Sequence, residues 1–328
     1  MKSTASTSFS FKAKNEICRA TPKRNCCRLA ELAALIHTSG TIRLAGKERV
    51  SLKISTENAF IARRIFTLIK SLTGESPEIL VRRNRRFRKN NNYVLLIAKP
   101  DVAKKILEDT CILFQDAEGN MRSQSDIDKR LVRRPCCRKS YLRGAFLGGG
   151  SVSDPRKAYH LELIAHSEKY GESLCRLVRE FGLHAKLIER KNNYVVYLKE
   201  GEHIVTLLSL IGAHTALLNL ENIRIYKDMR NHINRIVNCE TANLSKTINA
   251  SVRQVENIEY IRDRIGFSCL PPNLREVAEL RLSFPDASLR ELGERMIPRM
   301  GKSGVNHRLR KLDQIAEDHR GTRGCHEI

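Results

Sequence analysis

The sequence predicts an α+β fold in which two copies of one mixed unit are followed by a small all-α domain. The tripeptide Cys26-Cys27-Arg28 recurs as Cys136-Cys137-Arg138, 110 positions later, and each copy opens the same order of apolar patterns. In each copy, helical spacing of apolar residues gives way to strict alternation and back, which indicates helices and half-buried strands. After the second copy the pattern is helical only. Two long copies favour two facing lobes over a solenoid, because a solenoid usually needs three or more shorter repeats.

The first helix of each unit carries a stripe of small residues. Its members recur every four positions: Ala30, Ala34 and Thr38 in the first copy, and Ser140, Gly144 and Gly148 in the second. Small side chains at this spacing let two helix backbones approach closely. We therefore predict that the two first helices pack against each other at a pseudo-twofold axis. The alternative is that these are ordinary small residues in two buried helices.

Each unit is expected to follow the order αββαββα. After the first helix we expect two strands, an amphipathic helix that ends at a glycine, a hairpin and a closing helix. In the first copy these segments are 42–44, 50–54, 59–72, 79–81 with 93–97, and 102–107. In the second copy the strands start near Val152, and the later segments are 159–163, 171–181, 185–188 with 194–198, and 202–210. Two such sheets side by side would form a saddle.

The composition favours a polyanionic partner. The 328 residues carry a formal net charge of +23 and a pI of about 9.9, and 41% of them are hydrophobic. Such a charge favours nucleic acid over a membrane surface. No apolar run approaches the ~20 residues of a membrane span, and the Ser/Thr-rich start lacks the apolar core of a signal peptide. We expect a cytoplasmic, nucleoid-associated protein with no membrane partner.

The two cysteine pairs do not have the spacing of a zinc motif. Cys26-Cys27 and Cys136-Cys137 are adjacent residues rather than C-x2-C pairs. Neighbouring side chains on a helix point about 100° apart, so one pair chelates an ion poorly. We predict no metal site and no cofactor, and interpret the cysteines as small buried residues at the start of each first helix.

The order of elements over residues 20–225 resembles the LAGLIDADG homing endonucleases. The resemblance implies that the two first helices each end in an acidic residue just before the last glycine, and that the two carboxylates hold divalent metal ions for phosphodiester cleavage. The matching positions here are Ser39 and Gly149, which supply no carboxylate. We therefore predict no catalytic residue and a nuclease scaffold without nuclease activity. Residual endonuclease activity is the alternative.

A basic run lies at the tip of the first hairpin. Its members are Arg82, Arg83, Arg85, Arg86, Arg88 and Lys89. The functional interpretation is a secondary DNA contact through phosphates, and the alternative is a solvated hairpin tip.

The C-terminal part is typical of a helix-turn-helix domain. Residues 273–319 predict three helices, with Asn273, Ser288 and Ser303 as their N-caps and a capping box between Ser288 and Glu291. The third helix would bury Val305, Leu309 and Leu312 and present a polar, basic face to the major groove of double-stranded DNA. The expected DNA contacts are Ser288, Lys302, Ser303, Asn306, His307, Arg308, Arg310 and Lys311. Asn and Arg suit base edges, and the lysines and Arg308 suit phosphates.

These patterns divide the chain into six segments. They are an N-terminal extension (1–20), a first lobe (21–125), a second lobe (126–225), a helical linker (226–272), the helix-turn-helix domain (273–320) and a tail (321–328).

The combination of two degenerate LAGLIDADG-like lobes and this tail is similar to the WhiA family. Ser288-Leu289-Arg290-Glu291-Leu292-Gly293-Glu294 and the stretch from Lys302 to Lys311 carry the similarity, together with residues 57–64. It implies a DNA-binding transcriptional regulator linked to sporulation, cell division and chromosome segregation.

The leading hypothesis is thus a non-enzymatic, sequence-specific DNA-binding protein. A second hypothesis is an active endonuclease, and a third is a protein-docking scaffold with a DNA-binding tail, whose partners would include other regulatory proteins. The DNA target and the oligomeric state are left open.

Overall fold

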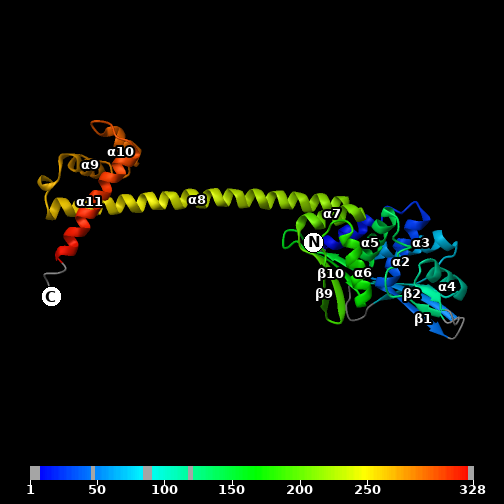
Figure 1. Cartoon of the computed structure of the whole chain (residues 1–328). Helices are drawn as coiled ribbons and strands as arrows, with labels where there is room; N and C mark the ends of the chain where they lie inside the picture. The colour runs from blue at the N-terminus through cyan, green and yellow to red at the C-terminus, as the bar shows by residue number, and fades with distance from the viewer. Residues whose placement is uncertain (1–7, 46–48, 84–90, 117–120, 324–328) are drawn as a thin grey trace. The chain divides into compact units, whose positions relative to one another are not determined.

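The computed structural model describes residues 8–45, 49–83, 91–116 and 121–323, and the chain divides into two compact units, 1–227 and 228–328 (Figure 1). The first unit contains two four-stranded antiparallel sheets with order β1-β2-β4-β3 and β7-β8-β10-β9. The second unit is helical. The predicted α+β class and the order αββαββα in each lobe are therefore confirmed.

The first lobe follows the predicted order and adds elements at both ends. It is built from α2 (Asn25–Ser39), β1 (Gly40–Ala45), β2 (Arg49–Thr56), α3 (Ala59–Thr73), β3 (Glu78–Arg83), β4 (Asn91–Ile97) and α4 (Pro100–Asp109). A helix α1 (Phe9–Ile17) lies within the segment that we expected to be an extension, and a short hairpin, β5 (Leu113–Gln115) with β6 (Met121–Ser123), follows α4.

The second lobe repeats this order. Its elements are α5 (Pro135–Gly149), β7 (Gly150–Val152), β8 (Leu161–Ala165), α6 (Glu168–Arg179), β9 (Lys186–Arg190), β10 (Asn193–Leu198) and α7 (Gly201–Ile211). In both lobes the first strand pairs antiparallel with the second directly after the first helix, as Gly40 opposite Ile54 and Gly150 opposite Leu163.

Alternation and glycine placement explain the elements of the first lobe. Val50, Leu52 and Ile54 of β2 are buried, while the residues between them are half-buried, so one face of the sheet packs on the helices. Helix α3 begins at the cap Asn58 and ends at Gly74, whose left-handed backbone (φ 76°) lets its N–H reach the carbonyl of Lys70. A side chain would be strained there.

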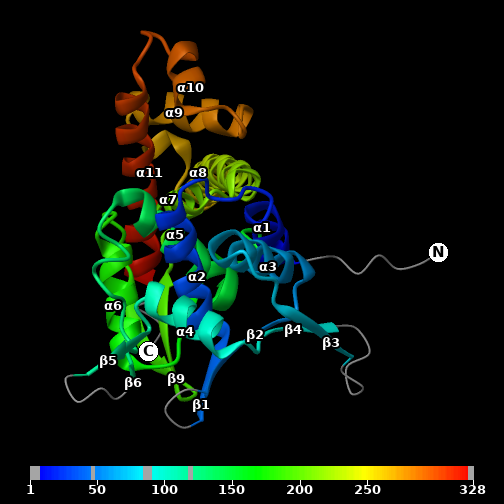
Figure 2. The ribbon, with the colours of Figure 1, turned by 90° about the vertical axis from the view of Figure 1, so that its right-hand side faces the viewer.

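Helices α2 and α5 lie side by side in the middle of the first unit (Figure 2). A Cβ atom at Gly144 would lie 2.9 Å from the Cβ of Ala34 and even closer to the backbone carbonyl of Glu31. Gly148 meets Thr38 in the same way. The stripe of small residues thus forms the contact between the two lobes, as predicted.

A buried carboxylate links the lobes beside this contact. Glu31 of α2 accepts hydrogen bonds from Arg64 of α3 at 2.6 and 3.0 Å, and both side chains are almost fully buried. Arg143 of α5 lies 3.5 Å from the same carboxylate and donates a hydrogen bond to the carbonyl of Ile211. A buried charge persists only when it is paired in this way, so Glu31 and its two arginines fix the lobes relative to each other.

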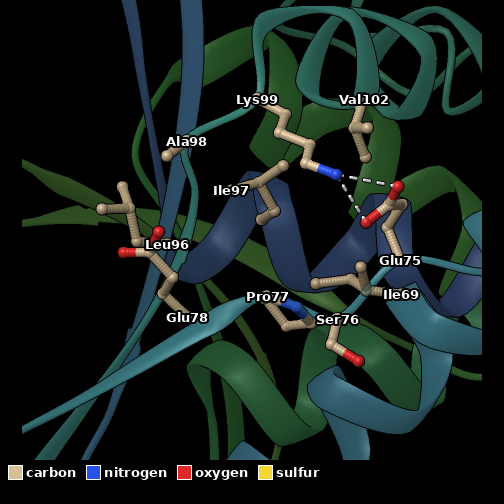
Figure 3. A pocket seen from close by; sticks show the side chains of 10 residues that line it. All are labelled: Ile69, Glu75, Ser76, Pro77, Glu78, Leu96, Ile97, Ala98, Lys99 and Val102. Atoms are coloured by element: carbon tan, nitrogen blue, oxygen red, sulfur yellow. Dashed lines mark hydrogen bonds and ion pairs between the residues drawn. The ribbon is translucent and has the colours of Figure 1, made fainter.

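The first lobe also contains a small cavity between α3, β4 and α4 (Figure 3). Its volume is about 80 Å³, and the ion pair between Lys99 and Glu75, with two 3.0 Å hydrogen bonds, lies at its rim. This space suits a few water molecules rather than a substrate.

The second unit contains most of α8 (His214–Arg264), η1 (Phe267–Cys269), α9 (Pro272–Ser283), α10 (Leu289–Arg295) and α11 (Lys302–Arg323). We predicted a linker over 226–272, but α8 already begins at His214, and Ile258 and Ile261 at its end are buried in the core of the C-terminal helices. The last turns of α8 are therefore a part of that domain. Within the described residues, no helix is long and apolar enough to cross a membrane.

Replacing Gly144 with alanine should destabilise the lobes. The added methyl group would force α2 and α5 apart, and overpacking of this kind costs about 1–3 kcal/mol. Urea denaturation followed by tyrosine fluorescence would measure the loss, because seven of the eight tyrosines lie in residues 1–227. Gly201→Ala is the matched control, since the nearest atoms to its Cβ would be 3.9 Å away. Equal unfolding midpoints for both variants would contradict the close approach.

Candidate nucleic-acid interface

Helix α11 has one buried and one exposed face, as the sequence predicts. Val305, Leu309 and Leu312 are at most 1% exposed and pack in the C-terminal core. At about 100° per residue, Ser303, His307 and Arg310 fall on the opposite side. All three are exposed, and so is Lys311 at the border of this face.

The turn before α11 is fixed by α10 and its cap. Ser288 and Glu291 form the predicted capping box, in which the serine hydroxyl accepts from the Glu291 N–H and the Glu291 carboxylate accepts from the Ser288 N–H at 2.7 Å. At the other end, Met300 N–H donates to the carbonyl of Gly293, and a Cβ at Gly293 would collide with Met300. Only glycine permits this close turn between the two helices.

Two internal contacts hold the preceding segments. Arg281 of α9, which is 2% exposed, donates to the carbonyls of Pro285 and Ala287 and so fixes the loop that leads into α10. Burial lowers the pKa of the Arg281 guanidinium from its usual value. A buried charge without hydrogen-bond partners is costly, so the carbonyls of Pro285 and Ala287 are required to stabilise the Arg281 guanidinium.

A polar network joins α8 to α11. Asn257 donates to Asp313 at 2.8 Å, and its own oxygen accepts from Arg320 at 2.8 Å. Arg253 lies 3.3 Å from the same Asp313 carboxylate. These contacts set the direction of α11, so the presented face depends on α8 as well as on the helix-turn-helix core.

Two of the predicted N-caps are wrong. Helix α11 begins at Lys302, and the carbonyl of Gly301 accepts its first backbone hydrogen bonds. Ser303 therefore lies inside the first turn. Helix α9 begins at Pro272 after the cap Pro271, so Asn273 is its second residue. Both prolines restrict the backbone to angles that suit a helix start, which overrides the capping tendency of asparagine.

The structure separates the predicted contact residues into different environments. Arg308 points to α9, where its guanidinium donates to the carbonyl of Asn273 at 3.2 Å and lies 3.7 Å from Glu276. Its side chain is only 19% exposed. Arg308 is therefore engaged inside the domain, which does not favour the phosphate contact that we expected. The hydroxyl of Ser288 is likewise used in the capping box.

Lys302 and Asn306 lie on the other flank of α11. They line a groove of about 890 Å³ together with α8 residues between Leu244 and Glu256 and with the loop before α10. Asn306 is half-buried and Lys302 is exposed. The structure thus brings Ser303, His307 and Arg310 together on the open face and places Lys302 and Asn306 at its edge.

Two exposed residues near this face are not among the predicted contacts. Gln314 follows Arg310 by about one turn and is exposed, although its amide lies 3.5 Å from Asp318. Its amide type suits an adenine edge, and helical spacing could have identified it. Ile297 in the turn before α11 is 88% exposed, and no sequence pattern distinguishes it from a core residue.

The ends of α2 and α5 carry no acidic pair at Ser39 and Gly149. The Ser39 hydroxyl donates to the carbonyl of Leu35 at 2.8 Å, within its own helix. The ring nitrogen Nε2 of His166, in the second lobe, lies 3.0 Å from the carbonyl oxygen of Thr38. The Ser39 hydroxyl is therefore bonded within its own helix, and the carbonyl of the residue before it contacts a side chain of the second lobe.

Gly149 has little free space around it. A Cβ atom there would lie 3.1 Å from the carbonyl oxygen of Ile164 and 3.5 Å from Thr38. The Ile164 carbonyl in β8 would have to shift by a few tenths of an ångström to admit a side chain, whereas the distance to Thr38 in α2 is an ordinary van der Waals contact.

The basic hairpin is described only in part. Arg82 is exposed near the end of β3, where it pairs with Asn92, and Arg83 pairs with Asn91. The remaining members, Arg85, Arg86, Arg88 and Lys89, lie outside the described residues.

Two groups of side chains among the described residues have the donor types and spacing of metal ligands. The first is the set Cys26, Cys27, Cys136 and Cys137, and the second is the exposed set His184, Glu200 and His203. We predicted no metal site because each cysteine pair alone would chelate an ion poorly. In the structure the two pairs lie together, so four sulfur donors are available at one place. In the second group, His203 Nδ1 already accepts the His184 N–H and lies 3.3 Å from Glu200.

Arg308→Ala and Arg310→Ala should differ in their effect on stability. Loss of Arg308 removes charge-assisted hydrogen bonding between α11 and α9, which is worth about 1–2 kcal/mol. Arg310 is exposed on the open face, so its loss should change the unfolding free energy by less than about 0.5 kcal/mol. Thermal unfolding followed by circular dichroism at the helix band would measure both. A larger loss for Arg310→Ala would contradict this assignment.

Comparison with known proteins covers both units. Residues 25–113 match the WhiA N-terminal LAGLIDADG-like domain, 138–230 the WhiA LAGLIDADG-like domain and 233–316 the WhiA C-terminal HTH domain. The chain is 54% identical over 314 residues to the probable cell division protein WhiA of Alkaliphilus metalliredigens, covering 96% of this chain and 99% of that protein. The relative of the same name from Thermoanaerobacter sp. is 54% identical over 310 residues, with 94% and 97% covered.

A solved structure agrees with this relationship. The crystal structure of full-length WhiA from Thermotoga maritima has a TM-score of 0.59 and 27% identity, and the similarity covers 95% of this chain and 99% of that one. With two LAGLIDADG-like domains, a C-terminal HTH domain and relatives that are more than half identical over nearly its whole length, the chain belongs to the WhiA family.

Proposed function

We propose that the chain is a non-enzymatic, sequence-specific DNA-binding protein that reads double-stranded DNA with α11. The single observation that carries this proposal is the face of α11 formed by Ser303, His307 and Arg310, which is exposed opposite a fully buried apolar face. A helix presented in this way fits the major groove. The formal net charge of +23 supplies the attraction to phosphates.

The lobes act as a scaffold without cleavage activity in this proposal. Neither Ser39 nor Gly149 supplies a carboxylate, and His166 lies within hydrogen-bond distance of the Thr38 carbonyl at the end of α2. Mg²⁺ takes oxygen ligands, chiefly carboxylates, so a two-metal mechanism lacks its ligands there.

The relatives are named for cell division. We propose that this chain is a transcriptional regulator that acts in cell division, sporulation and chromosome segregation and that resides on the nucleoid. Support comes from the helix-turn-helix match and from the similarity to the family along nearly the whole chain.

Variants of α11 should separate base reading from phosphate binding. Duplexes selected from a random library with the full chain would supply the target sequence. Arg310→Ala and Asn306→Ala should each lose ~1–3 kcal/mol of discrimination between target and random DNA, while Lys311→Ala should weaken both alike. Fluorescence polarisation measures these affinities. Lys105→Ala, an exposed lysine of α4 with the same charge change, is the matched control and should leave them unchanged.

Two outcomes would contradict the proposal. Equal losses on target and random DNA for Arg310→Ala would remove the major-groove assignment. Mg²⁺-dependent cleavage of the selected duplex by purified protein would restore the endonuclease hypothesis.

A second role, protein docking by the lobes, is favoured by the edge strand β3. Ile79, Leu80 and Val81 are 48%, 45% and 53% exposed in succession on the last strand of its sheet. An exposed apolar edge is a template for strand pairing with a partner. In this alternative the first lobe binds another regulatory protein and only the tail binds DNA.

The double variant Arg82→Ala/Arg83→Ala distinguishes the two roles of this hairpin. If both arginines contact phosphates, the slope of log affinity against log salt should fall by about 0.9 for each lost contact. If the lobe only docks a protein, the slope stays that of the wild type. Lys105→Ala again serves as the control for a lost charge in the same lobe.

A further inference from the structure

We propose that the four cysteines at the start of α2 and α5 form a binding site for one Zn²⁺ ion that links the two lobes. Each helix contributes one adjacent pair in its first turn: Cys26 and Cys27 from α2, and Cys136 and Cys137 from α5. The four sulfur atoms all lie within 4.8 Å of one another.

The geometry suits a tetrahedral ion. Zinc binds thiolates at about 2.3 Å, which places the sulfurs of a ZnS₄ site about 3.8 Å apart. A closure of at most about 1 Å would complete the site, and rotation of the cysteine side chains in the first helical turns can supply it. Neither adjacent pair alone could surround an ion, but two pairs on opposite sides provide four donors.

Burial raises the pKa of the Cys27 and Cys137 thiols, so the positive charge that stabilises four thiolates comes from the ion itself, the two helix ends and Arg24. Four thiolates and Zn²⁺ carry a net charge of −2, and both helices direct the positive ends of their dipoles at the cluster. The guanidinium of Arg24 lies 4.0 Å from the sulfur of Cys136, across the boundary between the lobes. On binding, the ion displaces the four thiol protons into solvent, so that no oxidant or reductant is needed.

The spacing of the sulfurs also favours a zinc ion over an iron–sulfur cluster at these four cysteines. An iron–sulfur cluster needs room for its own sulfides between the ligands, whereas sulfurs within 4.8 Å leave room for a single ion. An S₄ set of tetrahedral form selects zinc among the common divalent ions. Two disulfides between the helices are the remaining possibility, and the experiment distinguishes them.

The test uses the full chain, reduced with a phosphine and freed of metal with a chelator. Titration with Co²⁺ should give the visible bands of tetrahedral cobalt and thiolate-to-metal charge transfer, saturating at one ion per chain, and Zn²⁺ should displace the cobalt. Zn²⁺ should also raise the melting temperature of the wild type, because an ion that binds only the folded state stabilises it. A reduced wild-type chain that gives no thiolate bands and no shift in melting would overturn the proposal.

The double variant Cys26→Ser/Cys136→Ser removes one half-buried ligand from each helix. Its zinc affinity should fall by more than the roughly 10–100-fold that outer-shell partners contribute, and its melting temperature should no longer respond to Zn²⁺. Circular dichroism checks that it folds. Cys239→Ser/Cys269→Ser, at two exposed cysteines, and His203→Ala, in the other candidate group, are the controls and should bind like the wild type.

Three further results would count against the site. They are unchanged zinc affinity in Cys26→Ser/Cys136→Ser, loss of binding in His203→Ala, and iron rather than zinc in the protein as purified. Inter-helix disulfides in mass spectra of the chain purified without a reductant would also replace the metal site by a redox pair.

Discussion

The close approach of α2 and α5 is the constraint on which the first unit depends. With Gly144 against the backbone of Glu31, and Gly148 against the side chain of Thr38, the two helices approach each other closely at both positions. The same approach places Arg143 of one lobe within 3.5 Å of the Glu31 carboxylate of the other. It also joins the two cysteine pairs at one end and Ser39 with Gly149 at the other, about 20 Å away along helices of this length.

The second unit holds the polar helix α11 in a fixed direction within the C-terminal domain. The apolar face of α11 is buried against α8, α9 and α10, and the network of Asn257, Asp313 and Arg320 sets the direction of the helix. Some of the basic residues of α11 serve the fold rather than the surface, as Arg308 shows by its contacts with α9. The surface of α11 that is open to DNA therefore contains fewer basic residues than the helix carries. Ser303, His307 and Arg310 form the centre of that surface.

Local patterns predicted the order of elements, because alternation, helical spacing and glycine stops are properties of short segments. The β2 pattern of Val50, Leu52 and Ile54, the left-handed Gly74 and the Ser288 capping box are examples. The small-residue stripe was also predictable, because both copies carry it. The start of α8 at His214 was not, since no proline or change in charge marks it, and the N-caps at Asn273 and Ser303 were overridden by neighbouring Pro272 and Gly301.

The environments of individual site residues could not be predicted, because they depend on contacts between distant segments. The partner of Arg308 is on α9, 35 positions away in the case of Asn273. The four-cysteine cluster joins residues 110 positions apart, whereas each adjacent pair, considered alone, argues against a metal site. Tertiary proximity, rather than spacing along the chain, decides these roles.

The tight contact at Gly149 has a consequence for any attempt to restore the acidic pair. An aspartate there would bring its Cβ to 3.1 Å from the Ile164 carbonyl, and at the other helix end His166 already holds the Thr38 carbonyl. Two carboxylates at positions 39 and 149 would therefore need a small shift of the β8 backbone at Ile164, while the Thr38 carbonyl would still face His166. The environment of a metal ion at these helix ends thus depends on residues of the second lobe as well as on the two positions themselves.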